Sequence, residues 1–137
     1  MIREIIVSIY LLFHRLLFTF FRRFPLKNKV VFVVSFKDNN LYTYRELQKA
    51  KFSGEMVFLC KKNMYHVFKK SVKAPVYLIE AGNIRDEIVA AYHMATAKTI
   101  LVDNYYGFLS VMNFKKEVEC IQLWHAAGAV KNFGLMD

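Results

Sequence analysis

Cysteine is scarce in this sequence, and its spacing excludes two kinds of small domain. The 137 residues include two cysteines, Cys60 and Cys120, which lie far apart and each inside an apolar run. Neither has a neighbour at the spacing of a zinc site, and two cysteines provide no disulfide framework. We therefore expect two buried thiols in a cytosolic protein, and we expect no metal site.

Glycine and proline are also few, with five and two residues respectively. The first strand-like run is followed by SFKDNN (residues 35–40) rather than by a Gly-x-Gly-x-x-Gly turn, and no phosphate-binding loop ending in Lys-Ser or Lys-Thr occurs. A dinucleotide site at the first turn is therefore disfavoured, and no cofactor is expected. Repeats and low-complexity segments are absent, so the length predicts one folded domain with its own core.

Acidic residues are outnumbered by basic ones, 11 to 20, and the net charge is +9. Residues 1–29 contain six Lys or Arg and a single acid, Glu4, so this segment alone carries +5. A basic surface can meet nucleic acid or anionic lipid. The excess charge lies among aromatic and aliphatic residues, which favours lipid. No RNA-binding sheet motif or DNA-recognition helix is present, and we expect no nucleic-acid partner.

The basic segment reads as one helix over residues 5–24 that ends before Pro25. It lacks the small-residue cleavage site of a secretory signal peptide. On a helical wheel its polar residues share one narrow stripe, and leucine, isoleucine and phenylalanine fill the rest. The stripe comprises Glu4, Ser8, Arg15, Thr19 and Arg22.

Three interpretations of this helix remain open. A helix that spans a bilayer needs about 20 apolar residues, but Arg15 at its middle would cost about 2.5–3.5 kcal/mol on insertion scales. A helix that lies in the bilayer surface accepts both the charge and the apolar residues. A helix buried on its own sheet is the third possibility. Under the second interpretation the residues expected to contact the membrane are Arg15, Phe18, Phe21, Arg22 and Arg23.

The rest of the chain alternates strand-like and helix-like segments. Continuous β-branched and aromatic runs predict strands at residues 30–36, 55–60, 76–79, 99–102 and 118–124. Helices are expected at 42–51, 63–72 and 83–97, the last capped by Asn83. This alternation predicts an α/β fold with a parallel, Rossmann-like sheet covered on both faces. We divide the chain into a membrane-docking helix (1–26) and a Rossmann-like domain (27–137).

Polar and aromatic residues follow the fourth predicted strand, as DNYY at 103–106. The carboxyl end of a parallel strand is where α/β proteins bind ligands. Asp103 could orient a histidine or bind a sugar hydroxyl, and Asn104 and Tyr105 could contact the same sugar. The alternative is that Asp103 and Asn104 merely cap a turn.

The fifth predicted strand ends in Trp124 and His125, at the same edge of the sheet. An imidazole placed there can transfer a proton near neutral pH. Small residues follow, including Gly128, and let a substrate approach the backbone. His125 is therefore the catalytic candidate, with Trp124 and Gly128 as substrate-binding candidates.

The other histidines and the central lysines carry weaker signals. His14, His66 and His93 lie in helical patterns without partners at ligand spacing, so we expect surface or boundary positions. The lysines between the second and third strands are expected to form a solvated helix face, with a phosphate or membrane contact as the alternative. They are Lys61, Lys62, Lys69, Lys70 and Lys73.

DNYY (103–106) together with QLWHAAGAVKNFGLMD (122–137) resembles the CDP-glycerol glycerophosphotransferases that build wall teichoic acid, and within them the primase branch. The resemblance implies the amino-terminal half of a glycosyltransferase-B-like enzyme. That half would bind the membrane and a polyprenyl-diphosphate-linked N-acetylmannosamine disaccharide. It also implies that His125 is the general base. The pair Ala126-Ala127 departs from the family, because many relatives have Gly-Thr there and the primase pattern has Ala-Ser, so the hydroxyl is missing at Ala127.

Several expectations follow from this resemblance. The half that binds CDP-glycerol would lie beyond residue 137, so this chain alone is expected to be inactive in transfer. The protein is expected to be peripheral, on the cytoplasmic face of an anionic cell membrane. A non-catalytic membrane-associated interaction module is the alternative function.

Overall fold

The computed structural model of the chain describes residues 2–80, 82–104, 106, 109 and 112–123. Its helices are α1 (Ile2–Phe21), α2 (Asp38–Lys49), α3 (Lys62–Ser71) and α4 (Ile84–Thr96). Its strands are β1 (Lys27–Val34), β2 (Glu55–Cys60), β3 (Val76–Leu78), β4 (Ala97–Val102) and β5 (Glu119–Gln122). Each predicted helix and strand is present in the described part of the chain.

The five strands form one parallel sheet in the order β3-β2-β1-β4-β5. β1 lies at the centre, where Val31 pairs with Val57 of β2 and with Ile100 of β4. Its last six residues are all buried, as expected for a β-branched run covered on both faces. The predicted Rossmann-like α/β class is confirmed.

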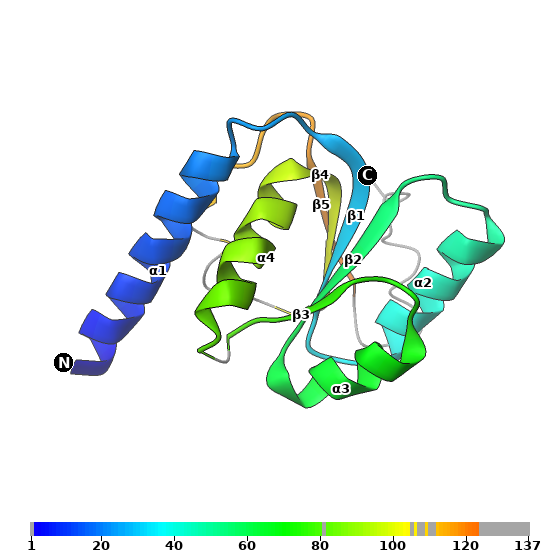
Figure 1. The fold of residues 1–137 in the computed structure, drawn as a ribbon, viewed down its shortest axis with the longest axis horizontal. Helices are drawn as coiled ribbons and strands as arrows, with labels where there is room; N and C mark the ends of the chain where they lie inside the picture. The colour runs from blue at the N-terminus through cyan, green and yellow to red at the C-terminus, as the bar shows by residue number, and fades with distance from the viewer. Residues whose placement is uncertain (1, 81, 105, 107–108, 110–111, 124–137) are drawn as a thin grey trace.

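Helix α4 covers one face of the sheet, with α1 outside it, and α2 and α3 cover the other face (Figure 1). Successive residues of β1 alternate between these layers because strand side chains point to opposite faces. Val31 and Val33 join the core beneath α4, and Phe32 joins the core beneath α2 and α3. Phe32 stacks on Phe58 with ring centroids 4.4 Å apart.

Helix α1 is not buried on the sheet but packs on the outside of α4 (Figure 1). Helix α2 begins at Asp38, four residues before the predicted start, because its first turn is held by the loop after β4, as described below. The predicted cap of α4 is present, since the Asn83 side chain accepts from Asp86 N at 3.2 Å.

The two cysteines differ in environment. Cys60 ends β2 inside the core, where burial raises the pKa of its thiol to about 12. Cys120 is exposed. It lies on β5, which is the edge strand of the sheet among the described residues. The prediction of two buried thiols is therefore wrong for Cys120.

The strand order places a switch point between β1 and β4. From β1 the chain moves to β2 on one side, whereas β4 and β5 lie on the other. In open α/β sheets the crevice beyond the carboxyl ends of the strands at such a point is the usual ligand site. In Figure 1 this edge is the lower end of the sheet, where α2 and α3 begin.

Candidate functional site

Asp103 joins the two loops at the switch point. It follows β4, is 1 % exposed, and directs its carboxylate into the loop after β1. Ser35 N donates to both of its oxygens at 2.9 Å, and Phe36 N donates to Oδ2 at 2.7 Å. Asn40 Nδ2, in the first turn of α2, donates to Oδ2 at 2.7 Å. The carboxylate therefore fixes the entry of the chain into α2.

Tyr106 adds a further bond to this network. Its hydroxyl donates to Asp103 Oδ1 at 3.1 Å and lies 2.5 Å from Ser35 Oγ. Burial raises the pKa of Tyr106, and the negative charge of Asp103 raises it further. The phenol is therefore a permanent donor near neutral pH.

A hollow of about 220 Å³ opens beside this network. Its volume suits a small polar group, such as part of a sugar or a phosphate. Lys37 and Asp38 bring opposite charges to its wall, and the Asn39 side chain can donate and accept. The described residues that line it are Phe36, Lys37, Asp38, Asn39 and Asp103.

The structure describes some of the predicted site residues and not others. Asp103 lines the hollow, and the half-buried Asn104 follows it directly. Tyr105, Trp124, His125 and Gly128 lie outside the described residues. β5 pairs with β4 up to Gln122, and Leu123 N donates to Val102 O at 2.6 Å. The described part of the chain therefore ends, with Leu123, at this same edge of the sheet.

Sequence reasoning missed two members of the network, Ser35 and Asn40. Both lie in the polar stretch after β1, which was noted for its lack of glycine rather than for its side chains. Asn40 is 0 % exposed and its Nδ2 also donates to Phe36 O at 2.9 Å. A fully buried asparagine needs a hydrogen-bond partner, but the burial of Asn40 is visible in the structure and not in the sequence.

A second charged group borders this network. Lys61 follows β2, and its Nζ lies 3.5 Å from Glu80 Oε1 and 5.6 Å from the centroid of the Tyr106 ring. Glu80 has a φ of 55°, which is uncommon for a residue with a side chain. The ion pair thus extends the polar network from β4 and β1 to the ends of β2 and β3.

Helix α1 is locked to α4 by a buried polar contact. His14 Nε2 lies 3.3 Å from Glu87 Oε1, and both side chains are at most 5 % exposed. Glu87 Oε2 also accepts from Tyr10 OH at 3.4 Å and from Glu80 N at 3.1 Å. The expected surface or boundary position of His14 is therefore wrong, because this side chain is buried against a partner on a helix remote in sequence.

The predicted membrane-contacting residues divide between two sides of α1. Phe18 is 2 % exposed and packs edge-on against Phe114, so it belongs to the core rather than to an outer surface. Phe21 packs against Tyr92, and Arg22 Nε donates to Asn113 O at 2.6 Å. Arg15 and Arg23 are exposed.

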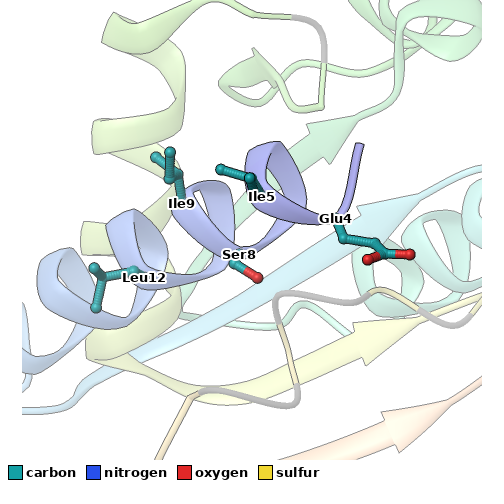
Figure 2. A pocket seen from close by; sticks show the side chains of 5 residues that line it. All are labelled: Glu4, Ile5, Ser8, Ile9 and Leu12. Carbon is teal, nitrogen blue, oxygen red and sulfur yellow. The ribbon is translucent and has the colours of Figure 1, made fainter. Parts of the chain in front are cut away.

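The outer side of α1 is apolar and exposed. Figure 2 shows Ile5 and Ile9 projecting from one side of the helix, opposite Glu4 and Ser8. The described residues that line the hollow drawn there, of about 290 Å³, all belong to α1. By length and composition α1 could cross a membrane, with a mean hydropathy of 1.7. The exposed apolar side chains on this side, here named the outer face, are Ile2, Ile5, Ile6, Ile9, Leu12, Leu16 and Phe20.

A separate buried cluster lies at the opposite, amino-terminal edge of the sheet. Lys29 is 1 % exposed, and its Nζ donates to Thr96 Oγ1 at 2.6 Å and lies 3.0 Å from His93 Nδ1. Burial lowers the pKa of Lys29 to about 8 and that of His93 to about 4. His93 is therefore neutral near pH 7 and accepts from the ammonium. Within the described residues no group of His, Cys, Asp or Glu could hold a metal ion.

Together these features define a Rossmann-like α/β domain with a candidate ligand site at the carboxyl edge of its parallel sheet. Comparison with known proteins specifies the class. Residues 16–137 match the model of the family described as CDP-Glycerol:Poly(glycerophosphate) glycerophosphotransferase. The chain belongs to this family.

Three relatives illustrate the match. The teichoic acid glycerol-phosphate primase of Bacillus subtilis strain 168 is 31% identical over 136 residues, which are 99% of this chain and 36% of the relative. The primase of the same name from Bacillus spizizenii is 36% identical over 112 residues, 82% of this chain and 29% of the relative. The teichoic acid poly(ribitol-phosphate) polymerase of that organism is 30% identical over 119 residues, which are 83% of this chain and 17% of the relative. The chain thus spans about a third of the length of the two primases.

Proposed function

We propose that this chain is the acceptor-binding and membrane-docking part of a primase-type glycerophosphotransferase. The enzyme would move glycerol phosphate from CDP-glycerol to a polyprenyl-diphosphate-linked N-acetylmannosamine disaccharide, in wall teichoic acid synthesis. The observation that carries the proposal is the polar hollow at the switch point. It occurs in a chain of which 99% aligns with a glycerol-phosphate primase. The donor would bind to the part of the relatives that lies beyond the matched third.

The reaction requires a base at this edge of the sheet. An acceptor hydroxyl would lose its proton to the imidazole of His125 as its oxygen bonds to the glycerol-bearing phosphorus. The bond from that phosphorus to CMP breaks, and CMP leaves. An alcohol is a poor nucleophile at neutral pH, and a positioned base typically contributes about 10²–10⁴-fold. Asp103 and its hydrogen-bond partners would shape the pocket that holds the sugar.

The transfer assay tests the catalytic part of the proposal in a full-length enzyme that begins with this sequence. His125→Ala is expected to lower the rate of transfer from CDP-glycerol by about 10²-fold or more, with an unchanged far-UV circular dichroism spectrum. His66→Ala is the matched control, because His66 is exposed on α3 and none of the described contacts of the network involves it. An unchanged rate in His125→Ala would instead favour a non-catalytic interaction module.

The outer face of α1 is proposed to lie in the surface of an anionic bilayer, on its cytoplasmic side. Residues such as Ile9 and Leu16, each 61% exposed, would bury their remaining apolar surface in the lipid. Arg15 is exposed on the same helix and Arg23 in the turn that follows it, and both would meet lipid phosphates. Full burial of one such side chain is worth about 1.5–3 kcal/mol, so several half-exposed residues suffice for docking.

A transmembrane orientation is less favourable for the same helix. Its inner side is packed on α4 through the buried pair of His14 and Glu87. Insertion across the bilayer would separate that pair or draw Glu87 into hydrocarbon, in addition to the cost of Arg15. A helix lying in the interface keeps both contacts.

Vesicle sedimentation tests the docking surface. Ile9→Ser combined with Leu16→Ser is expected to weaken binding to anionic vesicles about 10- to 100-fold, because apolar burial is lost without a change of charge. Tyr42→Ser is the control, since Tyr42 is 49% exposed on α2, in the opposite layer. These substitutions test the outer face more specifically than removal of residues 1–24 would, because that deletion would also remove Phe18 from the core. Binding that survives in the double variant would exclude the outer face as the anchor.

A further inference from the structure

Lys61 is held where the strand ends meet the polar network of the hollow. It follows the last residue of β2, and its backbone N–H donates to Val34 O at the end of β1 at 3.0 Å. Its ammonium lies over the ring of Tyr106, whose hydroxyl bonds to Asp103. In Figure 1 this is the lower edge of the sheet, where α3 begins beside β2.

The contacts of this ammonium leave it available to a ligand. The lysine and glutamate side chains of the ion pair with Glu80 are 36% and 27% exposed, and their charged atoms are 3.5 Å apart. Pairs of this kind contribute about 0–1 kcal/mol. A phosphate oxygen makes shorter and stronger charge-assisted hydrogen bonds with an ammonium. A ligand phosphate that takes the place of the Glu80 carboxylate as the partner of the Lys61 ammonium would therefore be bound favourably.

The local helix does not explain a lysine at this position. Lys61 is the residue that precedes the first turn of α3, and its side chain makes no cap hydrogen bond there. A positive charge is unfavourable at this end of a helix, where the dipole is also positive. Lys37 occupies the same place before α2 and lines the hollow, but no described contact orients its ammonium.

We propose that Lys61 binds the diphosphate of the lipid-linked acceptor, next to the hollow that receives the sugar. This inference rests on the proposed function and specifies which group of the acceptor the carboxyl edge recognises. Lys61 does not itself line the hollow, but its ammonium lies over the ring of Tyr106, whose hydroxyl bonds to the Asp103 that does. The diphosphate separates the sugar from the lipid chain, so a cation beside a sugar-binding hollow has the required position. The ligand chemistry is that of a phosphate anhydride dianion.

The test uses the 137-residue chain and phosphatidylcholine vesicles, with or without a few per cent of the polyprenyl-diphosphate-linked disaccharide. The acceptor is expected to increase vesicle binding of the wild-type chain, and millimolar inorganic pyrophosphate should suppress this increment. Lys61→Gln is expected to reduce the increment about tenfold, and Lys61→Arg should retain most of it. Lys62→Gln, with the same charge change at an exposed neighbour, should leave it unaltered.

The outcomes separate this inference from the function on which it rests. If Lys61→Gln keeps the full increment, or pyrophosphate does not compete, Lys61 does not bind the diphosphate and acceptor binding by the chain still stands. If the folded wild-type chain shows no increment, acceptor binding fails as well. A polyprenyl monophosphate without sugar is included to measure attraction to lipid charge alone, and an increment of equal size there would also overturn the inference.

Discussion

The substitution Asp103→Asn tests whether one carboxylate organises the candidate site. It keeps the size of the side chain but replaces one acceptor oxygen with an amide that cannot accept. The change acts on a carboxylate that accepts from four donors, which come from the loop after β1, from α2 and from the segment after β4. They are Ser35 N, Phe36 N, Asn40 Nδ2 and Tyr106 OH.

The expected loss of stability follows from these bonds. A hydrogen bond to a charged group contributes about 1.5–3 kcal/mol, and a buried donor left without an acceptor costs a similar amount. Since one oxygen still accepts in the variant, we expect a net loss of about 3 kcal/mol. For a domain of this length that lowers Tm by about 10 °C. The free energy of unfolding is measured by urea titration with circular dichroism.

Asp38→Asn is the matched control, because Asp38 lines the same hollow and loses the same charge. It is exposed in the first turn of α2, so only a dipole interaction of about 0.5 kcal/mol is lost. If Asp103→Asn changes the free energy of unfolding by no more than this control does, the carboxylate does not hold the loop. Its role would then be that of an ordinary turn residue.

Three further predictions concern the buried ionisable groups. His14→Phe should lower the free energy of unfolding, measured by urea titration, by about 3 kcal/mol, because it leaves Glu87 buried without its imidazole partner. Adding Glu87→Gln should recover part of this loss, and the absence of any recovery would contradict the pairing. The His93 pKa falls from 6.5 to about 4 on folding, so stability should decline by up to about 3 kcal/mol as pH falls from 6.5 to 4. A His93→Gln variant with an unchanged pH profile would refute this. The pKa of Lys29 falls from 10.5 to about 8 on folding, so its charge disfavours folding at neutral pH, and stability should rise between pH 8 and 10.5. Lys29→Met should stabilise the chain at pH 7 by about 2 kcal/mol and remove that rise. A loss of stability at pH 7 would contradict this prediction.

The fold could be predicted because its signals are local. A continuous apolar run such as that of β1 indicates a strand buried on both faces, and the alternation with helices indicates parallel pairing. Element ends were less accurate where distant contacts decide them. β1 starts at Lys27 rather than at residue 30, since Lys27 pairs with Ala97 of β4, and α2 starts at Asp38 because Asp103 organises its first turn.

The candidate site was predictable in part for the same reason. Residues that directly follow a strand mark the carboxyl edge, and Asp103 was found in this way. Its partners were not, because Ser35 and Asn40 lie 68 and 63 residues away in sequence. The pairing of His14 with Glu87 is likewise tertiary, and nothing in the helical pattern of either segment reveals it.

The contacts of Glu87 bear on how a membrane-bound substrate would be presented to the site. One oxygen of this carboxylate faces His14 of α1, and the other accepts from the backbone of Glu80, whose side chain pairs with Lys61. The helix proposed to lie in the bilayer is therefore connected by packed and hydrogen-bonded groups to the edge proposed to hold the acceptor. A polyprenyl chain keeps the diphosphate at a fixed depth, close to the lipid headgroups. A link of packed groups between helix and site would hold the site at one depth without a further ordering cost on binding, whereas a flexible tether would have to be ordered for each acceptor.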